Sequence, residues 1–133
     1  MTNPQEKYSA LGRHVLLELH DCPAHLLERP PTSEAFLLAA AERMHATVVS
    51  SHFHAFSPYG VSGVVIIQES HLTIHTWPEY GYAAIDIFTC GQLQIEEGVQ
   101  YLFKAFEAQG QQVRELTRGI VLNASTCDKL PER

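Results

Sequence analysis

The sequence has few basic residues and no cluster of them. Nine Lys and Arg are scattered along 133 residues that also contain fifteen Asp and Glu, so the formal net charge is −6. A nucleic-acid surface needs Lys and Arg side chains gathered against phosphates. We therefore expect no nucleic-acid partner. The excess of acid is compatible with a cationic substrate but does not identify one.

Long apolar runs are also missing, and we expect no secretory leader. No apolar stretch approaches the roughly 18 residues that a membrane-spanning helix needs, and the first residues, MTNPQEK, lack the layout of a secretory signal. The three cysteines, Cys22, Cys90 and Cys127, are widely spaced without a CxxC pair, which argues against a disulfide framework. We expect a cytoplasmic protein with no membrane partner, in which Cys22 and Cys127 are structural or incidental.

The length predicts a single domain, residues 1–133. Its first eleven residues are polar and predict a loose arm. The remaining chain contains apolar and β-branched runs bounded by Pro, Gly and Asp, which predict strands. These predicted strands cover 12–20, 46–56, 61–68, 72–77, 82–89 and 112–121.

Two further stretches have the composition and spacing of helices. The first follows a Pro-Pro pair, with Thr32 or Ser33 expected as N-cap and Glu34 as an acid in the first turn. The second covers 95–109, with Gly110 expected as its C-cap. It carries an apolar stripe that we expect to face the core, formed by Val99, Leu102, Phe103 and Phe106.

This order of elements indicates an α+β fold. Consecutive strands flanked by helices favour a two-layer α/β sandwich, with a mostly antiparallel sheet and both helices on one face. The opposite face of the sheet is then left open. Its strands are apolar enough that we expect a partner to cover it, with two sheets packing across a dimer.

The segment 68–80, QESHLTIHTWPEY, combines a serine, two histidines, a tryptophan and two carboxylates. Glu69 and Ser70 fall between two predicted strands, so we expect a tight, strained hairpin that directs the Ser70 hydroxyl at the carbonyl of Glu69. Serine is a weak nucleophile that needs a base, and His75 is the candidate. Strict strand alternation places Ser70 and His75 on opposite faces, so irregular backbone is required for them to meet.

Each of the singled-out side chains also has an ordinary interpretation. Taken alone, Ser70 is typical of a turn, His75 of a hydrogen-bonded strand residue and Cys90 of a small buried hydrophobe. Phe56 and Trp77 are compatible with core aromatics. A wider sequence pattern is needed to favour catalytic roles for these side chains over ordinary structural ones.

That wider pattern consists of three blocks, YGVSGVV at 59–65, ESHLTIHTWPEYGYAA at 69–84 and DIFTCG at 86–91, with LGRH at 11–14. Together they resemble the signature of the prokaryotic S-adenosylmethionine decarboxylases, small pyruvoyl-dependent enzymes. The resemblance is dense from about Thr47 to Gly91 and weak after the second predicted helix. The resemblance implies a processing reaction, residue roles and an activity that the individual residues do not indicate by themselves.

The resemblance implies a self-cleaving precursor. The bond between Glu69 and Ser70 would break by an internal acyl shift, giving a β chain, 1–69, and an α chain, 70–133. Elimination and loss of ammonia would leave a covalent pyruvoyl group at residue 70, the cofactor that forms a Schiff base with the substrate amine.

The resemblance also assigns roles to single residues. His75 matches the residue that removes the Ser70 α-proton during processing, and Ser62 matches a serine that assists processing. Cys90 matches the catalytic proton donor, a role suited to a thiol near neutral pH.

The implied activity is decarboxylation of S-adenosylmethionine to the aminopropyl donor of spermidine synthesis, by a homodimer of cleaved protomers, (αβ)₂. We expect Phe56, Trp77 and Glu79 to bind this substrate by stacking, cation–π attraction and hydrogen bonding.

Three alternatives remain open. A pyruvoyl decarboxylase of the same fold can act on arginine or ornithine instead. His52 with His54, and His71 with His75, share faces at strand spacing and allow a metal-binding protein. A catalytically inactive relative with a binding or regulatory role is the third alternative.

Overall fold

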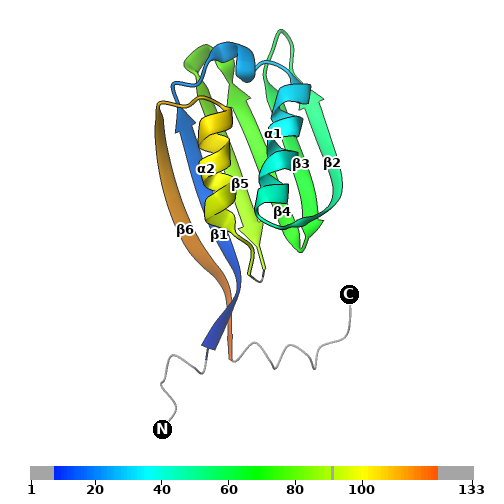
Figure 1. Ribbon diagram of the computed structural model, residues 1–133, viewed down its shortest axis with the longest axis vertical. Coiled ribbons are helices and arrows are strands. Elements are labelled where there is room, and N and C mark those ends of the chain that lie inside the picture. Colours follow the sequence, from blue (N-terminus) through cyan, green and yellow to red (C-terminus); the bar gives the residue numbers. More distant parts are fainter. Residues whose placement is uncertain (1–7, 91, 123–133) are drawn as a thin grey trace.

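The computed structural model of the chain describes residues 8–90 and 92–122 (Figure 1). One six-stranded sheet has the order β2-β3-β4-β5-β1-β6, and every neighbouring pair is antiparallel. The strands are β1 (Tyr8–His20), β2 (Thr47–Ala55), β3 (Val61–Gln68), β4 (Ser70–Trp77), β5 (Tyr82–Thr89) and β6 (Gly110–Leu122).

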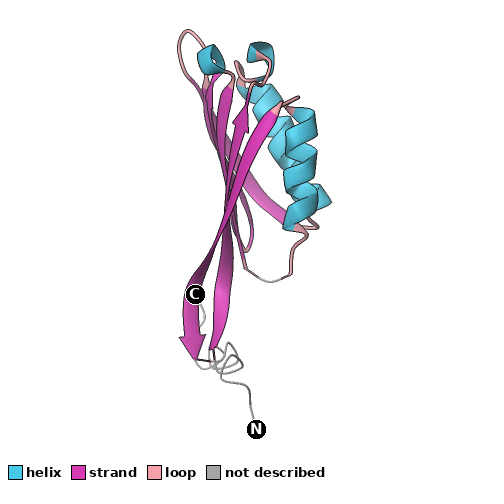
Figure 2. Ribbon diagram, turned by 90° about the vertical axis from the view of Figure 1, so that its left-hand side faces the viewer, coloured by secondary structure: helices cyan, strands magenta, loops and turns pink. Residues whose placement is uncertain are grey.

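Two α-helices, α1 (Pro30–Arg43) and α2 (Ile95–Ala105), lie on one face of this sheet. Among the described residues, no helix or strand covers the opposite face (Figure 2). Short 3₁₀ helices occur at Ala24–Leu26 (η2) and Pro78–Tyr80 (η3). The predicted two-layer α+β architecture with an antiparallel sheet is therefore confirmed. Within the described residues, no helix is long and apolar enough to cross a membrane.

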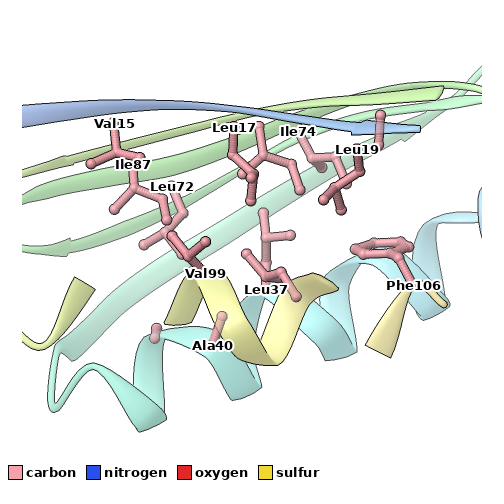
Figure 3. Close-up of a cluster of buried hydrophobic side chains, with 14 of the residues drawn as sticks. Val15, Leu17, Leu19, Leu37, Ala40, Leu72, Ile74, Ile87, Val99 and Phe106 are labelled. Carbon is pink, nitrogen blue, oxygen red and sulfur yellow. The ribbon is translucent and has the colours of Figure 1, made fainter. Parts of the chain in front are cut away.

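The core fills the space between the sheet and the helices, because strand side chains alternate between the two faces. Fully buried Leu and Ile side chains contribute roughly 1.5–3 kcal/mol each. The strands contribute Val15, Leu17, Leu19, Leu72, Ile74 and Ile87 to this core. The helical layer contributes Leu37, Ala40, Val99 and Phe106 (Figure 3).

The predicted strands over 61–68 and 82–89 coincide with β3 and β5. The prediction of a loose arm over the first eleven residues is wrong for residues 8–11. Residues 8–11 belong to β1, because this strand continues past the sheet and pairs with β6, for example Tyr8 with Leu122 and Ala10 with Ile120. Residues 1–7 lie outside the described part of the chain.

The expected cap of the first helix is also wrong. Helix α1 begins at Pro30 with Arg29 as N-cap, and no side chain caps it. Proline suits the first helical position because its missing N–H would have no partner there. Thr32 and Ser33 therefore lie within the helix. Glu34 is not a first-turn acid, and it accepts a hydrogen bond from Ser51 Oγ at 2.8 Å instead.

The second helix ends earlier than predicted. Phe106 is the C-cap of α2, and the left-handed residue that follows is Glu107, with φ of 52°. Gly110 already belongs to β6, because the N–H of Gln109 donates to the carbonyl of His20 and starts the pairing with β1. The apolar stripe is confirmed: Val99, Leu102 and Phe106 are buried, and Phe103 packs partly buried against them.

Candidate active site

The expected hairpin is present at the junction of β3 and β4. Ile67 pairs with Ser70, which leaves Gln68 and Glu69 as the turn. Ser70 has a φ of 125°, a region that residues with a side chain rarely adopt and that costs of order 1–3 kcal/mol. Backbone strain therefore lies at the residue next to the expected cleavage point.

Strand β5 runs beside this strained residue. Ser70 pairs with Thr89, and the backbone N–H of Cys90 points at the carbonyl oxygen of Glu69, with an N···O distance of 3.4 Å. This carbonyl belongs to the peptide bond between Glu69 and Ser70. A backbone donor aimed at a carbonyl stabilises the negative charge that develops when a nucleophile attacks it. Cys90 is a free, half-buried cysteine, and it follows Thr89, the register partner of Ser70.

Ser62 and His75 meet at the other end of the hairpin. They are register partners on β3 and β4, and Ser62 Oγ lies 2.7 Å from His75 Nδ1. His75 follows Ser70 by five residues of continuous strand, which corresponds to about 16 Å. Within one chain the irregular backbone at Ser70 does not bring these two side chains together.

A concavity of about 320 Å³ surrounds the Ser62–His75 pair. Its lining includes all three predicted substrate residues, Phe56, Trp77 and Glu79. Phe56 is 48% exposed and Trp77 is 41% exposed, so neither is a core aromatic. Their interpretation as core residues is therefore wrong.

Tyr82 fixes the position of Trp77. The two rings stack at 5.3 Å between centroids, and the Tyr82 hydroxyl donates to the carboxylate of Glu18. Burial, together with this hydrogen bond, raises the pKa of Tyr82 to about 12. The hydroxyl therefore keeps its proton and remains a donor throughout the physiological pH range.

A polar cluster at the centre of the open face was not predicted. Asp86 accepts a hydrogen bond from Thr73 Oγ1 at 3.2 Å, and His14 Nε2 lies 3.6 Å from the same carboxylate. Burial lowers the pKa of His71, and repulsion by His14 and Arg118 acts in the same direction. The open face therefore carries charge as well as the aromatic concavity.

The sequence did not identify Arg118 as a neighbour of Phe88, because Arg118 lies on the last strand, far from Phe88 along the chain. Its guanidinium lies 5.0 Å from the centre of the Phe88 ring. The period of the predicted strand 112–121 places Arg118 on one face with Arg114, but it does not say beside which strand. Pairing of β6 with β1 is what carries Arg118 to Phe88.

The histidines do not form a metal site in the part of the chain that is described. Across residues 8–90 and 92–122, no three His, Cys, Asp or Glu side chains are grouped as a metal ion would require. Cys22 is buried, and burial raises the pKa of its thiol to about 11, which keeps it neutral and unreactive. Cys127 lies outside the described residues.

The fold and the site together define a class of protein: a two-layer α+β protein with a strained serine at a hairpin and a free thiol on the neighbouring strand. The comparisons with known proteins are more specific. The family model of S-adenosylmethionine decarboxylase matches residues 13–119. The chain belongs to the S-adenosylmethionine decarboxylase family, and the resemblance seen in the sequence is confirmed.

Individual relatives agree with this assignment. The chain is 46% identical to the S-adenosylmethionine decarboxylase proenzyme of Thermodesulfovibrio yellowstonii, over 93% of this chain and 91% of the relative. It is 51% identical to the proenzyme of the same name from Fervidobacterium nodosum, over 83% and 81%. The crystal structure of the adenosylmethionine decarboxylase from Aquifex aeolicus matches with a TM-score of 0.80 at 33% identity, covering 85% of this chain and 94% of that chain.

Proposed function

We propose that the chain cuts itself between Glu69 and Ser70 and then acts as a pyruvoyl-dependent decarboxylase of S-adenosylmethionine, yielding the aminopropyl donor of spermidine synthesis. The observation that carries the proposal is the strained Ser70 beside a carbonyl that already receives the N–H of Cys90. The word proenzyme in the names of the relatives supports it.

Self-cleavage begins at the Glu69 carbonyl carbon. Ser70 Oγ adds to this carbon, the carbon–nitrogen bond breaks, and the hydroxyl proton passes to the Ser70 nitrogen, which leaves an ester. Removal of the Ser70 α-proton then expels the Glu69 carboxylate and forms a double bond between Cα and Cβ of residue 70. Water replaces the nitrogen as ammonia and leaves a ketone, so the products are residues 1–69 and 70–133.

The pyruvoyl group forms from residue 70 itself, so its surroundings are those already described. The ketone supplies an acceptor for the electrons released when the substrate loses CO₂. Cys90 lies on the neighbouring strand, with its backbone N–H at Glu69. We assign its thiol the delivery of a proton to the substrate α-carbon, because a positioned side chain with a transferable proton can act as a general acid.

The separation of Ser70 from His75 requires a second copy of the chain. Proton transfer needs heavy atoms about 3 Å apart, whereas the strand separates these residues by about 16 Å. Two chains that pack their open faces about a two-fold axis perpendicular to β4 bring opposite ends of the hairpin together. Each site of this (αβ)₂ dimer would then combine Ser70 and Cys90 of one protomer with the partner's Ser62 and His75.

The aromatic concavity then supplies the substrate site of the partner. An adenine ring stacks on flat aromatic surfaces, and a sulfonium is attracted to the faces of such rings. Phe56 and Trp77 present these surfaces, and Glu79 adds a hydrogen-bond acceptor and a negative charge. This lining favours S-adenosylmethionine over arginine or ornithine, which have no ring to stack.

Release of CO₂ from carboxyl-labelled substrates tests the proposal. Purified protein should release it from S-adenosylmethionine and not from arginine or ornithine at equal concentration. A Ser70→Ala variant is the matched control and should release none, because no ketone can form at residue 70. Activity on arginine alone, or full activity of the Ser70→Ala variant, would overturn the assignment of substrate or of cofactor, respectively.

A further inference from the structure

Thr89 carries an unexplained polar group at the cleavage point. Its side chain is 1% exposed, and its Oγ1 is buried with no hydrogen-bond partner among the described residues. A buried hydroxyl without a partner loses its interaction with water and gains nothing in return. Such groups are rare in folded proteins, and each one calls for a physical explanation.

Thr76 shows how the same sheet treats a structural threonine. It lies buried on the same face of the sheet, and its Oγ1 donates to the carbonyl of Leu27 at 2.8 Å and accepts from the N–H of Val61 at 2.9 Å. The hydroxyl of Thr76 therefore both donates and accepts a hydrogen bond. The lack of a hydrogen-bond partner is therefore a property of the position of Thr89 and is not shared by Thr76.

The position of Thr89 is the cleavage hairpin. Thr89 is the register partner of Ser70, and the N–H of the next residue, Cys90, is the group directed at the Glu69 oxygen. The serine and the unpartnered hydroxyl thus lie on adjacent strands, β4 and β5, beside the turn that contains the Glu69 carbonyl. The other unpartnered hydroxyl among the described residues, that of Ser33, lies on helix α1.

We propose that Thr89 acts in self-cleavage, donating a hydrogen bond to the Glu69 oxygen as it becomes negative. This inference rests on the proposed function. When Ser70 Oγ adds to the carbonyl carbon, that carbon becomes tetrahedral and its oxygen moves out of the peptide plane. A donor that finds its acceptor only then stabilises the transition state and not the resting chain.

The step balances without a proton from Thr89. The new bond joins Ser70 Oγ to the Glu69 carbon, the broken bond is that of the carbon to the Ser70 nitrogen, and the serine proton ends on this nitrogen. Thr89 and the N–H of Cys90 hold the negative oxygen between these events, and both keep their hydrogens.

Thr89→Val tests this role because it removes the hydroxyl and keeps the shape. Chains made by cell-free synthesis are sampled over time, and intact mass gives the rate at which full-length chain is converted into two fragments. We expect Thr89→Val to split at least about tenfold more slowly than the unmodified chain, since loss of one oxyanion donor commonly costs more than that. Thr89→Ser, which restores the hydroxyl, should recover most of the rate.

Thermal unfolding separates this role from a structural one. In a Ser70→Ala background, where the chain stays uncut, Thr89→Val should leave the unfolding temperature unchanged or raise it. Thr76→Val, the matched control, should lower it because two buried partners lose their hydrogen bonds. A Thr89→Val chain that splits at the unmodified rate, or that loses stability as Thr76→Val does, would overturn the inference. An unmodified chain that never splits would instead overturn the proposed function.

Discussion

Complementation between two inactive chains tests whether the site is shared. His75 lies about 16 Å along β4 from Ser70 of its own chain, while proton transfer requires about 3 Å. His75→Ala and Ser70→Ala chains should therefore each stay uncut when made alone. In a mixed dimer, one of the two sites combines an intact Ser70 with the partner's intact His75.

The extent of rescue follows from random pairing. When equal amounts of the two chains associate, about half of the dimers are mixed, so about half of the His75→Ala chains acquire a competent site. All cleavage should fall on the His75→Ala chain and none on the Ser70→Ala chain. A short affinity tag on one chain makes the two fragments distinguishable by mass.

A control establishes that the chains do meet. Native mass measurement of the co-expressed sample should show mixed dimers before the fragments are counted. If mixed dimers are present and the His75→Ala chain remains uncut while the unmodified chain splits, His75 does not act across the dimer. Rapid cleavage of His75→Ala on its own would show that this histidine is not needed for processing.

Three further changes have expected outcomes. Cys90→Ser should still yield two fragments but lower kcat by about 10²–10⁴, the usual contribution of a positioned proton donor; cleavage with unchanged kcat would contradict its role. Trp77→Ala should raise KM for S-adenosylmethionine about tenfold, since stacking and cation–π attraction contribute about 1–2 kcal/mol; an unchanged KM would contradict its role. The pKa of His71 is lower in the folded chain than in the unfolded chain. Just below pH 6.5 the unfolded chain therefore binds more protons than the folded chain. The free energy of unfolding is highest above this pH and decreases as the pH falls from the unfolded pKa towards the folded one. In the uncut Ser70→Ala chain, His71→Gln should therefore flatten the fall of the unfolding temperature below pH 6.5, and an equally steep fall would contradict this.

Much of the fold was predictable because it depends on local patterns. Apolar and β-branched runs bounded by turn residues identified the strands, and β3 and β5 were placed with their observed bounds. Two of the errors occurred where strand pairing decides the structure. The arm at residues 8–11 is a strand because β6 lies beside it, and Gly110 is drawn into β6 by the contact of Gln109 with His20.

The sequence proposed the candidate site residues but not their geometry. Sequence blocks pointed to Ser70, His75 and Cys90, yet only the register of β3, β4 and β5 shows that Cys90 approaches Glu69 while His75 pairs with Ser62. Interactions between strands far apart in the sequence have no local signal. The contact of Arg118 with Phe88 and the unpartnered hydroxyl of Thr89 were invisible for the same reason.

The mass of the purified protein tests the central claim most directly. We predict two polypeptides, residues 1–69 and residues 70–133, of which the second resists amino-terminal sequencing and gains the mass of a hydrazide reagent at residue 70. A single uncut chain that takes up no hydrazide, yet releases CO₂ from S-adenosylmethionine, would contradict it.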